Sequence, residues 1–218
     1  MASTDLNLPS YYINRELSQL EFCRRVLFMA RDGGLPMLER LRYLSITSGI
    51  LDEFFEIRVA GLKQQADYGA VQRDADNLSA EEQLEQVSAA AKILVTDLYA
   101  TLNDDLLPEL KAQNIRLLRS SEWTDAQVNW LKRFFSREVA PIISPVGLDP
   151  AHPFPEPANK NLAFIVTLEG RDAFGRDSRR AIVQAPRSLP RVIQLPEDCS
   201  DGEECFVLLA SVVRFFVS

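Results

Sequence analysis

The residue type best suited to proton transfer near neutral pH occurs once in this sequence, at His152. It lies in the segment 149–155, which reads DPAHPFP. An imidazole on a rigid loop can serve as an acid, a base or a metal ligand. However, a two-histidine metal motif is impossible here, and no nucleophile stands at a recognisable spacing from the imidazole. We therefore interpret His152 as a turn residue that hydrogen-bonds to the backbone.

Three carboxylates fall within about one helical turn, at Asp52, Glu53 and Glu56. Carboxylate oxygens are the ligands that Mg²⁺ prefers, but we expect a magnesium site to draw its ligands from more than one structural element. The same acids also suit the positive N-terminal end of a helix. We favour this second interpretation, and we expect Asp52 and Glu53 to cap the third helix and to pair with arginines such as Arg40 or Arg42.

Two segments concentrate cations that could bind an anion. The first interleaves aromatic and basic side chains: Trp123, Trp130, Lys132, Arg133, Phe134, Phe135 and Arg137. The second groups four arginines: Arg171, Arg176, Arg179 and Arg180. The first segment could bind a polyanion and the second an anionic ligand, but helices more often bury their aromatic residues and leave their cations in water. We therefore expect a solvated helix face and a solvated loop.

The overall composition is that of a globular protein with a sizeable core. Of the 218 residues, 46% are hydrophobic and 25% are charged, and the formal net charge is −7. An acidic chain is a poor non-specific binder of nucleic acid, so we expect no nucleic-acid partner. Three cysteines, an odd number, predict reduced thiols rather than a disulfide framework. The sequence also lacks the phosphate-binding motif G-x-x-x-x-G-K-[ST], and its first residues lead us to expect no secretory signal.

The hydrophobic pattern of the first half predicts a bundle of four helices. We expect these helices over residues 18–31, 36–49, 51–65 and 79–114. The pattern S-x-x-E at 18–21 and again at 79–82 matches a capping box. Gly49 is expected to break or kink the second helix. Asp105 interrupts the apolar stripe of the fourth helix, with Leu106 beside it.

The second half alternates between strand-like and helical segments. We expect strands over 115–119, 142–146, 162–168, 181–184, 191–195 and 206–209, and a helix over 124–139 that opens with the capping box T-x-x-Q. The fold class is therefore α+β, with a helical N-terminal domain over 1–113 and a mixed α/β domain over 114–218. The apolar segment 208–218 lacks a helix C-cap, so we expect the second domain to be incomplete at its C-terminal end. The longest apolar run is too short to span a bilayer.

Several segments carry a family resemblance. They read YINRELS at 12–18, LERLRYL at 38–44, LDEFFEIRVAGLK at 51–63, GLDPAHPFP at 147–155, NKNL at 159–162 and VTLEG at 166–170. These segments, in the order in which they occur, resemble segments of bacterial polyphosphate kinases of the histidine-phosphorylating family. The resemblance implies reversible transfer of the terminal phosphate of ATP to inorganic polyphosphate. It also implies that the phosphorylated histidine and the Mg²⁺ ligands lie in C-terminal domains absent from this chain, so we expect the chain alone to be inactive.

The resemblance places the adenine side of the ATP site in the N-terminal domain. The family motif Ser-x-Asn-Leu-Asp-Glu-Phe aligns with residues 48–54, which read SGILDEF, so Ile50 stands where asparagine is expected. An amide can hydrogen-bond to a purine edge, whereas isoleucine cannot. Tyr43 aligns with a family aromatic residue, usually phenylalanine, and can stack on the base. Ile50 and Tyr43 are thus the nucleotide-binding candidates, and we assign no catalytic and no metal-ligating residue to this chain.

The resemblance also implies partners and a location. We expect ATP or ADP and inorganic polyphosphate as substrates, and a homo-oligomer formed through the second, "head" domain. We expect the protein in the cytoplasm, with peripheral attachment to the inner membrane as the alternative. A competing hypothesis for function is a non-catalytic module that truncation has left with only a nucleotide contact or a dimerisation surface.

Overall fold

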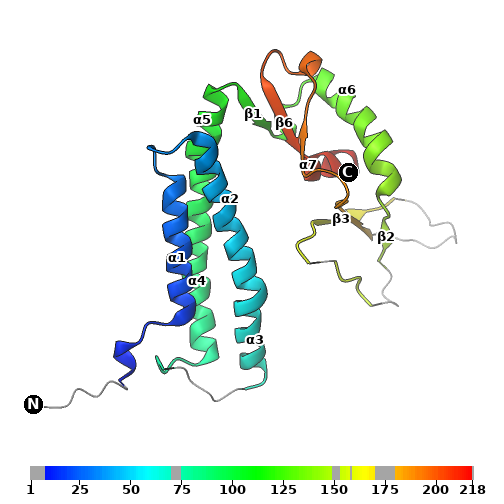
Figure 1. The fold of residues 1–218 in the computed structure, drawn as a ribbon. Coiled ribbons are helices and arrows are strands. Elements are labelled where there is room, and N and C mark those ends of the chain that lie inside the picture. Colours follow the sequence, from blue (N-terminus) through cyan, green and yellow to red (C-terminus); the bar gives the residue numbers. More distant parts are fainter. Residues whose placement is uncertain (1–7, 70–74, 149–152, 158, 170–179, 218) are drawn as a thin grey trace, which may run out of the picture. The chain divides into compact units, whose positions relative to one another are not determined.

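The computed structural model describes the chain except for residues 1–7, 70–74, 149–152, 158, 170–179 and 218 (Figure 1). Its contacts divide the chain into two compact units, Met1–Leu110 and Lys111–Ser218. The first unit is helical in its described part, and the second combines helices with two small sheets. The predicted α+β class is confirmed.

Long helical segments make up the described part of the N-terminal unit. A 3₁₀ turn (Pro9–Tyr11) is followed by α1 (Arg15–Ala30). The next helical segment consists of α2 (Met37–Glu53), a π-helical segment (Phe54–Val59) and α3 (Ala60–Asp67). The last consists of α4 (Ala80–Ala100), a second π-helical segment (Thr101–Leu106) and α5 (Leu107–Ala112). Helix α1 packs against α2 and α4, and α3 packs against α4 (Figure 1). Their apolar faces meet in one core that includes the fully buried Leu20, Leu27 and Leu94.

The predicted start of the first helix is wrong, because the S-x-x-E pattern at 18–21 lies inside α1. The helix begins at Arg15, and Asn14 is its N-cap. The Asn14 side-chain oxygen accepts hydrogen bonds from the backbone N–H groups of Glu16 and Leu17, at 2.9 and 3.0 Å. An amide oxygen at this position satisfies donors that the helix itself leaves unpaired.

The predicted break at Gly49 is also wrong. Helix α2 runs through Gly49 and continues through the π-helical segment into α3, so the expected second and third helices form one continuous segment. Glycine in a helix interior costs only about 1 kcal/mol relative to alanine. Burial of Thr47 and Leu51 on either side of Gly49 outweighs that cost.

Both π-helical segments of this unit place buried residues five positions apart. Phe54 and Val59 are buried in the first, and Thr101 and Leu106 in the second. Five residues span more than one α-helical turn but match the wider π-helical turn, which closes i→i+5 hydrogen bonds. The second segment explains the break in the stripe at Asp105, because the wider turn puts Leu106 in the core instead.

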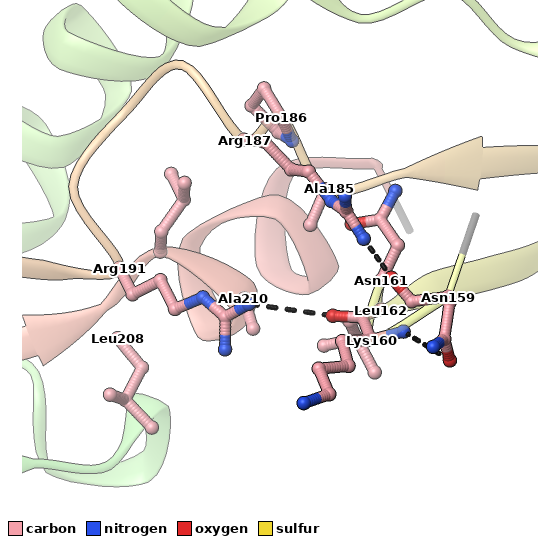
Figure 2. Close-up of a pocket in the computed structure, with 11 residues that line it drawn as sticks. Asn159, Lys160, Asn161, Leu162, Ala185, Pro186, Arg187, Arg191, Leu208 and Ala210 are labelled. Carbon is pink, nitrogen blue, oxygen red and sulfur yellow. Dashed lines mark hydrogen bonds between the residues drawn. The ribbon is translucent and has the colours of Figure 1, made fainter. Parts of the chain in front are cut away.

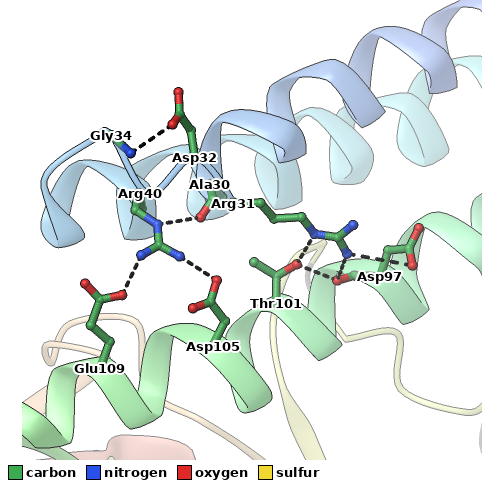
Figure 3. Close-up of polar contacts among 9 residues, drawn as sticks. All are labelled: Ala30, Arg31, Asp32, Gly34, Arg40, Asp97, Thr101, Asp105 and Glu109. Carbon is green, nitrogen blue, oxygen red and sulfur yellow. Dashed lines mark hydrogen bonds and ion pairs between the residues drawn. The ribbon is translucent and has the colours of Figure 1, made fainter.

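Asp105 takes part in a polar cluster around a buried arginine (Figure 3). The Arg40 side chain is only 7% exposed, and its Nε donates to the Ala30 carbonyl at 3.0 Å. Its two terminal nitrogens donate to Asp105 and Glu109. The predicted pairing of Arg40 or Arg42 with Asp52 or Glu53 is therefore wrong, and Arg40 instead ties the end of α1 and the start of α2 to the segment that follows α4.

The predicted start of the fourth helix is confirmed. The Ser79 hydroxyl accepts from the Glu82 backbone N–H at 3.2 Å, and the Glu82 carboxylate accepts from the Ser79 N–H at 2.7 Å. These reciprocal bonds satisfy two N–H donors at the helix start.

We expect Ser79→Ala to lower the free energy of unfolding by about 1 kcal/mol, because it removes one side of this capping box. Ser18→Ala is the matched control, since Ser18 starts an identical S-x-x-E pattern within α1. It should leave stability unchanged or raise it by about 0.5 kcal/mol, because alanine is the better helix former. Urea unfolding followed by far-UV circular dichroism measures both. Equal losses in the two variants would contradict the assignment of the cap.

The second unit contains two three-stranded sheets among its described residues. Its elements are β1 (Ile115–Leu118), α6 (Asp125–Phe134), β2 (Val146–Gly147), β3 (Ala163–Thr167), β4 (Arg180–Gln184), β5 (Val192–Gln194), β6 (Glu204–Leu208) and α7 (Leu209–Val217). One sheet has the order β1-β6-β5, in which β1 and β6 are parallel and β5 and β6 antiparallel. The other has the order β2-β4-β3 and is antiparallel throughout.

Most of the predicted elements of this unit are found near their expected positions. The capping box at Thr124 opens α6, which continues as a π-helical segment (Phe135–Val139) and a 3₁₀ turn (Ala140–Ile142). The strand expected over 142–146 is largely absent, because only Val146 and Gly147 pair with β4. The prolines at 141 and 145 bracket this stretch and cannot donate to a strand ladder.

Candidate functional site

The two nucleotide-binding candidates lie on one face of α2, seven residues apart. That spacing is close to two helical turns, so the side chains leave the helix in nearly the same direction. Tyr43 and Ile50 are both half-buried, and both pack against the core of the N-terminal unit. Thr47 lies between them and donates its hydroxyl to the Tyr43 carbonyl at 2.9 Å. Part of each candidate side chain thus contributes to the fold, and part reaches the surface.

A residue that the sequence reasoning did not single out as a site residue extends this apolar surface. Ile46 is three residues after Tyr43 and four before Ile50, and it is 42% exposed. These spacings put Tyr43, Ile46 and Ile50 in one row along the helix, which we call the α2 strip. A phenol ring flanked by branched aliphatic side chains offers an apolar surface to a flat ring. The spacing of three and then four residues between Tyr43, Ile46 and Ile50 was the signal in the sequence that could have indicated Ile46.

The acidic cluster lies in the middle of a helical segment rather than at its start. Asp52 and Glu53 close α2 and are exposed, and Glu56 lies in the π-helical segment that follows. The interpretation of these acids as N-terminal caps is therefore wrong. Among the residues that the structure describes, no group of three or more His, Cys, Asp and Glu side chains is placed to hold a metal ion.

The aromatic residues of α6 and its continuation serve the core of the second unit, as expected. The rings of Trp130 and Phe134 stack with their centroids 5.5 Å apart, and the ring centroids of Phe135 and Phe216 of α7 are 5.3 Å apart. Lys132 and Arg133 are exposed on the same helix. His152 and three of the four clustered arginines lie outside the described residues, and the fourth, Arg180, is exposed at the start of β4.

The three cysteines are free thiols. Burial raises the pKa of the Cys23 thiol and of the Cys205 thiol above their ordinary value. Both groups are therefore protonated at neutral pH, and a protonated thiol is a poor nucleophile. Neither residue supplies a reactive site.

A cavity in the second unit brings together residues that the sequence analysis did not connect (Figure 2). Its volume is about 760 Å³, and it is lined by residues 159–162, 185–187, 191 and 208–210. Three of the lining side chains are cations, Lys160, Arg187 and Arg191. The lining comes from four separate chain segments, so no local motif could have indicated it.

Comparison with known proteins identifies the family. The polyphosphate kinase N-terminal domain model matches residues 12–118, and the polyphosphate kinase middle domain model matches residues 126–218. The chain belongs to the polyphosphate kinase family. Both compact units thus correspond largely to domains that the family defines.

Individual polyphosphate kinases support the same assignment. The chain is 52% identical over 214 residues to a polyphosphate kinase of Pseudomonas putida, covering 98% of this chain and 29% of the relative. It is also 52% identical to one from Pseudomonas aeruginosa, covering 94% of this chain and 30% of the relative. The crystal structure of polyphosphate kinase from Porphyromonas gingivalis superposes with a TM-score of 0.76 at 25% identity, over 94% of this chain and 30% of that one.

The chain therefore spans about 30% of the length of the relatives it matches. Within its described residues, no helix is both long and apolar enough to cross a membrane.

Proposed function

We propose that this chain is part of an enzyme that reversibly transfers the terminal phosphate of ATP to inorganic polyphosphate. The observation that carries the proposal is the match of two consecutive polyphosphate kinase domains over residues 12–118 and 126–218. The phosphorylated histidine and the ligands of the Mg²⁺ cofactor belong, in this proposal, to the portion of the enzyme that this chain does not cover. The enzyme acts in the cytoplasm as a homo-oligomer that associates through the second unit.

Within that enzyme, we assign the α2 strip to the adenine side of the ATP site. The strip is apolar and partly exposed, which suits stacking by Tyr43. Ile50 offers no hydrogen bond to the purine edge. Adenine is therefore held here by shape and stacking, and the phosphates are held elsewhere.

Two substitutions in the full-length enzyme test this assignment. Tyr43→Ala should raise the KM for ATP by about twofold to tenfold, because a stacked aromatic contact contributes about 0.5–1.5 kcal/mol. Ile50→Asn should lower the KM by about twofold to tenfold, because a new amide bond to the base is worth about 0.5–1.5 kcal/mol. In both variants kcat should change little, since uniform binding affects KM alone.

The control is Ile57→Asn, which makes the same change at a side chain that is 68% exposed. It should leave both the KM and the melting temperature unchanged. If Ile50→Asn instead lowers the melting temperature while the KM stays unchanged, Ile50 serves only the core of the N-terminal unit. That result, together with an unchanged KM in Tyr43→Ala, would overturn the adenine assignment.

A further inference from the structure

Gly49 is a glycine that the fold of the N-terminal unit does not require. Helix α2 runs through it, and its φ lies outside the left-handed region that favours glycine. The residue is exposed, and a Cβ atom added there would meet nothing within 4 Å in the described part of the chain, apart from its chain neighbours and the backbone of its own helix. Glycine is the least favourable residue in a helix interior except for proline. The chain therefore loses helix stability at this position and gains no internal packing in return.

The position of Gly49 places it beside the α2 strip. It lies three residues after Ile46 and directly before Ile50, and residues three apart are neighbours on a helix surface. Because Gly49 has no side chain, the backbone of α2 is uncovered next to this apolar row. Glycine at such a position allows a ligand to approach the backbone closely.

The charges around Gly49 determine which part of ATP suits this surface. Asp52 and Glu53 follow it by three and four residues, which places both near it on the helix, and both are exposed. Carboxylates repel the phosphate groups of a nucleotide. The hydroxyl of Ser45, four residues before Gly49, donates to the Leu41 carbonyl at 3.0 Å, so its hydrogen is already bound. An uncharged ring that binds by packing therefore suits this surface better than a phosphate.

We propose that Gly49 contacts the purine ring of ATP and lets this ring lie directly against α2. The ring then also meets the side chains of Ile46 and Ile50. This inference rests on the proposed function, which assigns the α2 strip to the adenine side of the ATP site. The attraction between packed atoms falls steeply with distance, so any side chain at position 49 weakens the contact by holding the ring away from the helix.

Gly49→Ala in the full-length enzyme tests the proposal, because it should not change affinity and stability in the same direction. The KM for ATP should rise about threefold or more, since the added methyl group separates the ring from the backbone, and kcat should change little. The melting temperature should rise or stay unchanged, since alanine is the better helix former. A lower melting temperature with an unchanged KM would show that Gly49 is only structural and would overturn the proposal.

Gly61→Ala is the matched control for this change. Gly61 lies in α3, about three helical turns beyond Ile50, and a Cβ atom added there also meets nothing within 4 Å. This variant gains the same methyl group and the same helix propensity, so it should leave the KM for ATP unchanged. An equal rise of the KM in both variants would contradict a local contact at Gly49.

Gly49→Leu extends the test with a larger side chain that also favours a helix. Its KM for ATP should exceed that of Gly49→Ala, because the larger side chain holds the ring farther from the backbone. The KM for polyphosphate should match that of the parent enzyme in both variants, since a base contact concerns the nucleotide alone. Equal rises in the two KM values would assign this surface to packing within the enzyme and would overturn the proposal.

The same assays separate this inference from the proposed function. A full-length enzyme that transfers phosphate from ATP to polyphosphate, with a KM for ATP that Gly49→Ala does not change, would overturn only the role of Gly49. A full-length protein that transfers no phosphate would overturn the proposed function, and this inference with it.

Discussion

Replacing Arg40 with methionine is expected to lower the free energy of unfolding of the N-terminal unit by about 2–4 kcal/mol. The side chain is 7% exposed, and its guanidinium binds the Ala30 carbonyl, Asp105 and Glu109. Methionine fills similar volume but leaves the carbonyl and both carboxylates without their donor. The carboxylates are 45% and 36% exposed, so water recovers part of the loss, and the effect stays below that of a fully buried ion pair.

Arg42→Met is the matched control for this change. Arg42 lies on the same helix, its side chain is 71% exposed, and its contact with Glu39 measures 3.8 Å. Its replacement should cost less than about 0.5 kcal/mol. Far-UV circular dichroism during urea unfolding follows the helices, and fluorescence follows the second unit, which holds both tryptophans. A loss for Arg40→Met as small as that expected for Arg42→Met would contradict a stabilising role of the Arg40 cluster.

Asn14→Ala is expected to destabilise the same unit by about 2–4 kcal/mol, because Asn14 combines two roles. Its side-chain oxygen caps α1, and its amide nitrogen donates to Asp76 at 2.7 Å and to Gln83 at 3.0 Å. Gln83 is 4% exposed, so water cannot easily replace the lost bond. The cap alone accounts for about 1 kcal/mol of the expected loss.

Asn14→Ser separates the two roles. Serine keeps an oxygen that caps the helix but has no amide to reach Asp76 and Gln83. We expect it to cost about 1–2 kcal/mol, between the parent chain and the alanine variant, measured by the same unfolding experiment. A serine variant as stable as the parent would show that the two long-range bonds are dispensable.

Local sequence patterns predicted the helix starts that depend on local bonds. The capping boxes at 79–82 and 124–127 satisfy donors within one turn of chain, and both are found as expected. The same S-x-x-E pattern at 18–21 is not a cap, because Asn14 is held by Asp76 and Gln83, 62 and 69 residues away. No local sequence pattern indicates such long-range bonds. The sequence alone therefore could not decide whether the helix is capped by Asn14 or by Ser18.

Tertiary packing also determines the structure around Gly49 and Asp105, two residues whose effect the sequence did not reveal. Gly49 was expected to break or kink a helix, but α2 continues through it between buried neighbours. Asp105 was recognised as a break in an apolar stripe, yet its cause, a π-helical turn and a buried Arg40, needed the structure. A single π-helical turn changes which side chains face the core, but it changes the spacing of hydrophobic residues in the sequence very little.

The candidate sites differ in how far the sequence could indicate them. Tyr43 and Ile50 were found by resemblance to a family, and their nucleotide contact stays a prediction. The cavity formed around Lys160, Arg187 and Arg191 was not foreseen, because its cations lie on segments up to 31 residues apart. The folding of the chain alone brings these segments around one cavity.

The phosphate-transfer assay of the full-length enzyme tests the central claim most directly. The full-length protein and this 218-residue chain are incubated separately with labelled ATP and Mg²⁺, and labelled polyphosphate and phosphoprotein are measured. We predict that the full-length protein forms polymer and that the chain alone forms neither polymer nor a stable phosphoprotein. Polymer or bound phosphate from the chain alone, or a full-length protein that transfers no phosphate to polyphosphate, would contradict the account.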